Sequence, residues 1–149
     1  MRWILGAALI ASYGLPGPAQ AQDCAATIDG NDAIQFNLSE MTASSGCESF
    51  TLTLRHVGSL AANIMGHNWV LTTTANYESV AMAGQAAGMD NNYVPAGDAR
   101  VIAATAIIGG GEETSVTFDA SALEPGGDYT YFCSFPGHYV LMKGKLVVE

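Results

Sequence analysis

Apolar and polar residues alternate along much of the chain with the two-residue period of half-buried strands. In the segment 49–55, for example, Phe50, Leu52 and Leu54 are separated by threonine residues. The same alternation recurs in the segments 34–39, 69–71, 115–119, 129–133 and 146–148. Several short strands of this kind, with turn residues between them, are typical of an all-β sandwich or barrel.

One segment departs from this pattern. Ala75 to Ala87 is rich in alanine and methionine and is followed by Gly88, a residue type that commonly ends helices. We therefore expect one short helix here, packed outside the sandwich. The run Gly109-Gly110-Gly111 lacks the Lys-Ser/Thr pair that a phosphate-binding loop requires, and we interpret it as a turn before a strand.

The first residues have the features of an export leader. A positive start at Met1-Arg2 precedes an apolar run from Trp3 to Leu15, and Ala19-Gln20-Ala21 supplies the small residues that signal peptidase needs. This run is shorter than the roughly 20 apolar residues that span a bilayer. The sequence therefore predicts a cleaved signal peptide at 1–21 and a single domain at 22–149, with no membrane insertion of the mature chain.

The mature chain is strongly acidic. From Gln22 onward it carries four basic residues against fourteen acidic ones, a net charge of −10. Such a chain is repelled by nucleic acid and by anionic lipid surfaces, so we expect no nucleic-acid partner. The acidic residues are scattered along the sequence, which is typical of a solubilising surface.

The cysteine count raises a further question. Cys24, Cys47 and Cys133 make an odd number, and an exported chain meets an oxidising compartment in which cysteines pair. One thiol must therefore be left over. It could be buried and inert, pair with another chain, act as a nucleophile or hold a metal.

The residues near the C-terminus favour a metal. A thiol, an imidazole and a thioether lie within ten residues, at Cys133, His138 and Met142. Thiolate and thioether sulfur favour Cu(I), whereas imidazole binds both copper states. Two histidines and one cysteine, with a distant methionine, form the blue-copper sites of electron-transfer proteins. The second histidine must come from another segment, which leaves His56 and His67.

His67 is the better candidate for the second imidazole. It lies at the start of a predicted strand, directly after Gly66. Because glycine has no side chain, the Gly66 carbonyl could approach a metal. The next residue, Asn68, could hydrogen-bond across to the loop around Cys133 and hold the two segments together.

These motifs resemble those of the azurins, within the wider cupredoxin group of blue-copper proteins. The matching segments include Gly66-His67-Asn68-Trp69 and Cys133-x4-His138-x3-Met142, together with Asn31-Asp32 and Leu141-Met142-Lys143-Gly144. The resemblance covers nearly all of the mature chain. It implies an eight-stranded Greek-key β-sandwich of cupredoxin type, located in a bacterial periplasm.

The resemblance also implies a function. We expect one copper ion (Cu+/Cu2+) per chain in a type 1 site, which carries single electrons between redox partners without catalysing a reaction. The partners would be c-type cytochromes or periplasmic oxidoreductases. By the same resemblance, His67, Cys133 and His138 would be the equatorial ligands. Met142 would be the weak axial ligand, with the Gly66 carbonyl opposite.

Two further features follow from the resemblance. A disulfide between Cys24 and Cys47 is implied, and closing a loop of this length is worth about 3 kcal/mol. An uncharged face around His138 would serve transient docking of partners. The residues expected to form it are Ile34, Leu60, Ile64, Met65, Phe135, Pro136, Val140 and Leu141.

Three other functions share some of these residues. A copper oxidase or nitrite reductase domain has a histidine beside its ligand cysteine, whereas Phe132 and Ser134 flank Cys133 here. A thiol hydrolase using Cys133 and His138 would need an orienting group and an oxyanion hole, and the sequence announces neither. A copper storage or delivery protein would use the same ligands and stays open.

His56 is interpreted as a structural histidine rather than a ligand. Related chains usually have a proline after this histidine, and this chain has Val57 instead.

Overall fold

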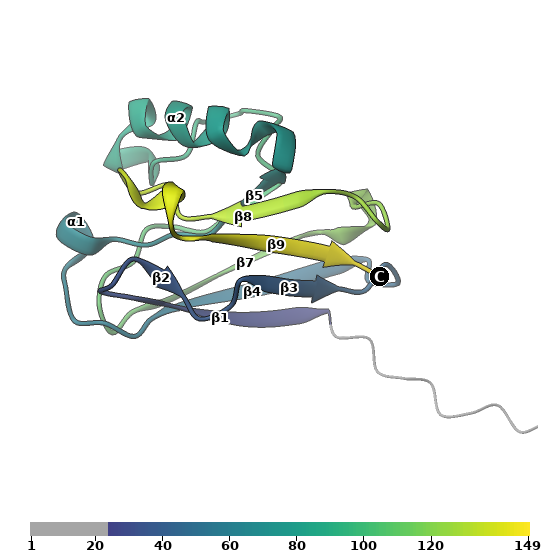
Figure 1. Cartoon of the computed structure of the whole chain (residues 1–149), viewed down its shortest axis with the longest axis horizontal. Helices are drawn as coiled ribbons and strands as arrows, with labels where there is room; N and C mark the ends of the chain where they lie inside the picture. Colours follow the sequence, from purple (N-terminus) through teal and green to yellow (C-terminus); the bar gives the residue numbers. More distant parts are fainter. Residues whose placement is uncertain (1–23) are drawn as a thin grey trace, which may run out of the picture.

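The computed structural model describes residues 24–149, so the expected signal peptide lies outside the described residues. The described chain forms a sandwich of two β-sheets, and one longer helix, α2 (Tyr77–Ala87), lies over the outer face of one sheet (Figure 1). This arrangement confirms the predicted all-β sandwich with an external helix.

Nine strand segments make up the two sheets of residues 24–149. The first sheet contains, in spatial order, β2 (Gln35–Phe36), β1 (Ala25–Asn31), β4 (Ser49–His56) and β7 (Glu113–Asp119). The second sheet contains, in spatial order, β3 (Glu40–Ala43), β9 (Lys143–Val148), β8 (Tyr129–Phe132), β5 (Val70–Thr73) and β6 (Ala103–Ala104). Both sheets are mixed, because β1 pairs in parallel with β4 and β3 in parallel with β9, whereas the other pairs are antiparallel.

The first sheet is buried on one face only. Phe50, Leu52 and Leu54 of β4 are fully buried in the core, and the residues between them are not, so the predicted alternation is confirmed. Trp69 also lies in this core, where its indole N–H has no hydrogen-bond partner among the described residues. Burial of these large side chains between the sheets is the main stabilising contribution.

The part of the second sheet that contains β5 and β8 is covered on both faces. Val80 and Ala81 of α2 pack with Val70 of β5 and Phe132 of β8 in a separate apolar cluster. For this reason all four residues of β8 are buried, although sequence alternation had indicated only one buried face. The helix begins after a 3₁₀ turn (Thr74–Asn76) and ends at Ala87, directly before Gly88, close to the predicted bounds.

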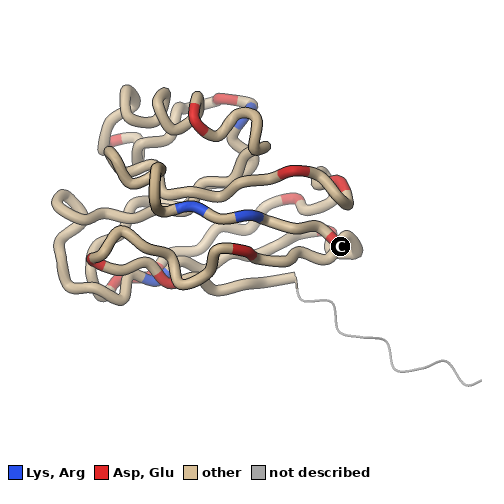
Figure 2. Tube along the Cα trace, in the orientation of Figure 1, with Lys and Arg blue, Asp and Glu red and all other residues tan. Residues whose placement is uncertain are grey.

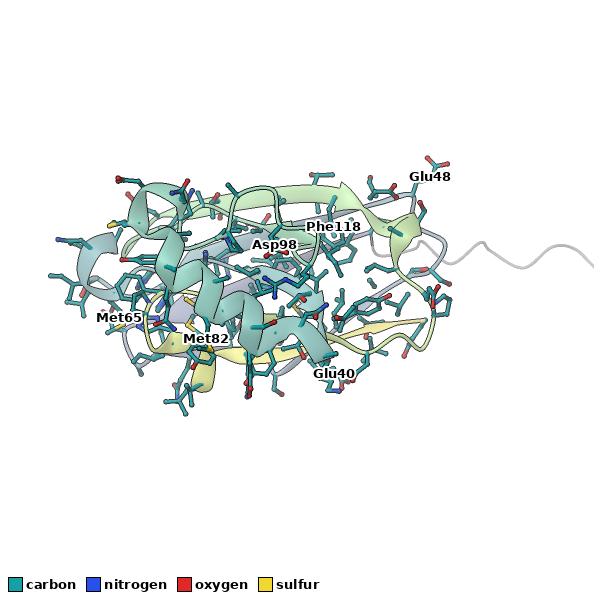
Figure 3. The ribbon with its side chains drawn as sticks, turned by 90° about the horizontal axis from the view of Figure 1, so that it is seen from above. Glu40, Glu48, Met65, Met82, Asp98 and Phe118 are labelled. Carbon is teal, nitrogen blue, oxygen red and sulfur yellow. A yellow bond between two sulfur atoms is a disulfide. The ribbon has the colours of Figure 1, made fainter. Side chains whose placement is uncertain are left out.

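Shorter helical segments join the strands. They are α1 (Ala62–Met65) and the 3₁₀ turns Met89–Asn91, Ala120–Ala122 and His138–Val140. The single turn α1 was not predicted, and no side-chain hydrogen bond caps its first turn. Met65, its last residue, lies at one end of the molecule, and Glu48 lies at the opposite end (Figure 3).

The alternation at 34–38 does not form a regular strand. Only Gln35 and Phe36 pair with β1, across a tight three-residue loop. Ile34, the last residue of that loop, has a φ of 60°. A left-handed residue at this place is typical of hairpin loops of three residues, although glycine normally occupies it. The apolar side chain of Ile34 therefore belongs to a turn.

The ends of the strands also carry the disulfide. Cys24 and Cys47 are bonded, with a Cα–Cα separation of 5.6 Å, whereas Cys133 is free and buried. The pairing that the resemblance implied is thus present. Acidic residues are spread along the trace of residues 24–149 (Figure 2), as the sequence suggested. Within residues 24–149, none of the helices has the length and apolar character needed to cross a membrane.

Candidate metal centre

Three donor side chains from two separate segments meet in the structure. The antiparallel pairing of β5 with β8 places the residues just before β5 beside those just after β8. As a result, Cys133 Sγ lies 3.8 Å from His67 Nδ1 and 3.6 Å from His138 Nδ1. The three donor atoms all lie within 4.8 Å of one another, and all three residues are buried.

These separations fit one bound metal ion. Bonds of about 2.3 Å to sulfur and about 2.0 Å to nitrogen are usual for a first-row metal such as zinc. With bonds to nitrogen of about 2.0–2.1 Å and bond angles between tetrahedral and trigonal, the sulfur and nitrogen atoms are separated by about 3.5–3.8 Å. The observed spacings of 3.6 and 3.8 Å match this range.

Met142 lies against the same cluster. Its side chain is fully buried, and its backbone carbonyl accepts a hydrogen bond of 2.9 Å from the Cys133 N–H. A Cβ added at Gly30 of β1 would lie 2.8 Å from both the Met142 Cε and the His67 Cδ2. The end of Met142 and the ring of His67 therefore both reach the space over Gly30, and the thioether belongs to the surroundings of the donor cluster.

The Gly66 carbonyl also faces the cluster, with its oxygen 3.9 Å from Cys133 Sγ. Gly66 has ordinary extended φ and ψ angles, so its backbone does not require glycine. The requirement is space, since a Cβ at this position would collide with the carbonyl oxygen of Ala62. The tight approach of the chain after α1 thus brings a backbone oxygen to the site.

Both imidazoles are neutral at physiological pH. The His67 Nε2–H donates a 2.8 Å hydrogen bond to the Asn31 carbonyl, which leaves the lone pair of Nδ1 directed toward Cys133. Burial lowers the pKa of His67 to about 4, although the bond to Asn31 opposes this shift. Burial, with repulsion from His67, likewise lowers the pKa of His138 to about 4. Neutral imidazole is the form that binds metals.

The thiol of Cys133 is protonated in the absence of metal. Burial raises its pKa to about 12, although backbone N–H groups of Asn68 and Phe135 donate hydrogen bonds to the sulfur and lower it. A metal must therefore displace this proton when it binds, because the thiolate is the ligand form.

Asn68 ties the two donor segments together. Its Nδ2 donates a 2.8 Å hydrogen bond to Ser134 Oγ, and its Oδ1 accepts one of 2.8 Å from the Ser134 N–H. The predicted bond between Asn68 and the loop around Cys133 is therefore confirmed. Since Asn68 follows His67 and Ser134 follows Cys133, this pair of bonds fixes the two donors relative to each other.

His56 lies behind the cluster and not in it. Its ring is buried and stacks on that of His67, with centroids 4.4 Å apart. Its Nε2–H donates a 2.8 Å hydrogen bond to the Met65 carbonyl, and its Nδ1 accepts one of 3.1 Å from the Gly58 N–H. Both ring nitrogens are thus engaged with the backbone, as expected for a structural histidine.

The residues expected to form a docking face differ in exposure. Leu60, Ile64, Val140 and Leu141 are among the exposed large apolar side chains of the described chain. Pro136 is exposed as well, and Ile34, Met65 and Phe135 are half-buried.

Several residues of the site were missed by sequence reasoning. Gly30 leaves space for the His67 ring, the Asn31 carbonyl orients it, and Ser134 receives the Asn68 amide. All act through the backbone, a hydroxyl or an empty space. Two signals were available, because Asn31 lies in a segment that resembles the azurins and Ser134 directly follows the cysteine.

A two-sheet sandwich that holds one buried thiol and two neutral imidazoles, with a thioether beside them, defines the cupredoxin class of blue-copper proteins. The sequence profile of the copper binding proteins of the plastocyanin/azurin family matches residues 22–149. The chain belongs to this family.

Similar proteins point to the azurins within the family. The chain is 58% identical to azurin-1 of Alcaligenes xylosoxydans xylosoxydans over 124 residues, which are 83% of this chain and 96% of that protein. It is 48% identical to the azurin of Pseudomonas aeruginosa over 135 residues, 91% of each chain. The solved structure of the azurin Az-iso2 from Methylomonas sp. strain J has a TM-score of 0.82 and 46% identity, covering 85% of this chain and 98% of that one.

The function that the sequence suggested is therefore confirmed in its main terms. The protein is a blue-copper electron carrier with one copper ion per chain, and not an enzyme.

Proposed function

We propose that His67, Cys133 and His138 are the three strong ligands of the copper ion, and that the Met142 thioether and the Gly66 carbonyl are two weak ones. Three observations support this assignment: the spacing of the donor atoms, the neutral state of both imidazoles and the burial of all these groups. Bound copper supplies the one-electron step between Cu(I) and Cu(II).

The chain contributes a rigid surrounding for that step. Asn68 and the strands on either side hold His67 and Cys133, so little rearrangement of ligands accompanies electron transfer. The N–H groups of Asn68 and Phe135 that face the Cys133 sulfur stabilise its negative charge and thereby tune the reduction potential.

The ligand assignment is tested by adding Cu(II) to the metal-free protein. We expect an intense thiolate-to-copper absorption band, which Cys133→Ser abolishes and Met142→Leu shifts without abolishing. A colourless product with the unmodified chain would contradict the assignment. Electron self-exchange of the loaded protein, without release of copper to a metal-free acceptor, would separate electron transfer from copper storage or delivery.

The apolar face around His138 is the proposed docking surface for redox partners. His138 is only 4% exposed, whereas the nearby residues Val140 and Leu141 are 55% and 72% exposed. An apolar rim close to a ligand ring suits short-lived contacts with small interfaces. We propose c-type cytochromes or periplasmic oxidoreductases as the partners.

Docking is tested by placing one new charge inside or outside this face. Val140→Glu should slow electron exchange with a c-type cytochrome about tenfold or more, because it buries an unpaired charge in the interface. Met82→Glu is the matched control, since Met82 is 65% exposed on the outer face of α2 and the net charge changes equally. Equal rates for both variants would contradict docking at this face.

The proposal also includes the cellular location of the protein and the limits of its domain. The family match to residues 22–149 and the leader-like composition of 1–21 support cleavage after Ala21 and a periplasmic location. The intact mass of the protein from a periplasmic extract tests this, and a chain that retained residues 1–21 would contradict it.

A further inference from the structure

Two consecutive residues outside the donor segments have left-handed backbone. Asn92 and Tyr93, in the loop that follows the turn Met89–Asn91, have φ angles of 54° and 53°. This conformation costs most residues about 1–2 kcal/mol, although asparagine tolerates it better than others. It persists only where neighbouring contacts hold it in place. The contacts of this loop therefore indicate what the conformation serves.

Asn92 bonds to two segments that adjoin His67. Its backbone carbonyl accepts a 2.8 Å hydrogen bond from Asn68 Nδ2, and its side-chain Oδ1 accepts one of 2.9 Å from the Ile107 N–H. Asn68 directly follows His67, and Ile108 forms a β-bridge with His67 through bonds of 3.0 and 2.9 Å. Asn92 thus holds both the residue that follows His67 and the segment that pairs with His67.

The carbonyl of Asn92 also fixes the orientation of the Asn68 side chain. A carbonyl can only accept a hydrogen bond, so the amide nitrogen of Asn68 must face Asn92. The amide oxygen must then face the Ser134 N–H, to which it is bonded at 2.8 Å. Through Asn68, the position of Asn92 is therefore coupled to the residue that follows Cys133.

Tyr93 holds the loop in place. Its carbonyl lies directly against Gly84 of α2, where a Cβ would collide with it. Its ring packs edge-on against Phe135, with centroids 5.4 Å apart and an interplanar angle of 71°. The loop therefore packs between α2 and the segment that joins Cys133 to His138. It cannot adopt a more favourable backbone conformation without breaking these contacts.

We propose that Asn92, which supplies no metal ligand, is a positioning residue of the copper centre. Its left-handed backbone and its side-chain oxygen hold Asn68 and Ile107, and through them the Cys133 sulfur keeps its place relative to His67. This inference rests on the ligand set proposed above. Asn92 acts from a loop between α2 and β6, well outside both donor segments.

The first test uses the metal-free protein. In Asn92→Ala, which removes the side-chain acceptor and disfavours the left-handed backbone, the amides of Ser134 and Ile107 should exchange with solvent about fivefold faster or more, the effect of losing one hydrogen bond. Asn92→Asp keeps both features and should restore protection. Asn91→Ala is the matched control, because Asn91 Nδ2 bonds only to the Ala87 carbonyl among the described residues.

The second test uses the copper-loaded protein. Asn92→Ala should shift the thiolate-to-copper band and the reduction potential, whereas Asn91→Ala should lower the thermal midpoint alone. Should Asn92→Ala fail to fold, Asn92→Gly favours the left-handed backbone and removes the side chain with its Oδ1 acceptor. It should speed exchange at Ile107 and shift the band less.

Wild-type exchange and an unshifted band in the folded variants would overturn the positioning role. A band that survives Cys133→Ser would instead refute the ligand set itself, so the two failures can be told apart.

Discussion

His67 and His138 make the metal-free protein sensitive to acid. Burial holds the pKa of both rings at about 4, against 6.5 in an unfolded chain. The unfolded state therefore takes up protons first as the pH falls. The stability that the two neutral, buried rings allow the folded state is therefore complete above pH 6.5 and is lost as the pH falls toward 4. We expect the free energy of unfolding of the metal-free protein, measured in urea, to drop over this window.

A variant isolates the contribution of one ring. In His138→Gln the drop between pH 6.5 and 4 should be smaller, because one of the two buried imidazoles is absent. An equally steep drop in this variant would show that other groups cause the acid sensitivity.

At this scale, the sequence reveals residues whose chemical type is itself informative. Cys133, His138 and Met142 carry soft sulfur or imidazole donor atoms at short spacing, so a copper site could be predicted from them. Gly30 and Asn92 contribute an empty space and a backbone carbonyl. Such roles depend on contacts between distant segments, and no residue type announces them.

At the scale of elements, alternation predicts strands where one face is exposed to solvent. It succeeds for β4, whose outer side chains face water. Alternation is a weaker guide to β5 and β8, because α2 covers the outer face of these two strands and their residues are buried on both sides. It misleads at Ile34, where a turn residue happens to continue the pattern. The helix α2 was predictable because alanine-rich composition and a terminal glycine are local signals.

The packing of α2 is expected to reverse the usual effect of replacing a helical glycine by alanine. Replacing glycine by alanine inside a helix normally stabilises it by about 1 kcal/mol. At Gly84, however, the new Cβ would collide with the backbone carbonyl of Tyr93. We expect Gly84→Ala to destabilise the protein by about 1–3 kcal/mol, as overpacked sites do. Thermal unfolding measures this change.

The matched control for Gly84→Ala is an exposed position of the same helix. Ala86→Gly should cost about 1 kcal/mol through helix propensity alone. A higher thermal midpoint in Gly84→Ala would mean that α2 can move away from the Tyr93 loop.

At the scale of the whole molecule, the disulfide and the donor cluster lie at opposite ends of the sandwich. The disulfide adjoins Glu48, at the end of the sandwich opposite Met65 and the donor cluster (Figure 3). Replacing Cys24 and Cys47 by alanine should lower the free energy of unfolding by about 3 kcal/mol. The wavelength of the thiolate-to-copper band should not change. A shifted band would show that the two ends are coupled.

The separation of the disulfide from the free thiol also affects which cysteines can pair once the chain has folded. In the unfolded chain all three sulfurs are open to attack, and any two of them can join. Once the sandwich closes, Cys133 is enclosed at one end. Cys24 and Cys47 lie at the other end with their Cα atoms 5.6 Å apart, so a wrong bond can no longer form. Folding before oxidation therefore favours the bond between Cys24 and Cys47 and keeps the Cys133 sulfur free for copper.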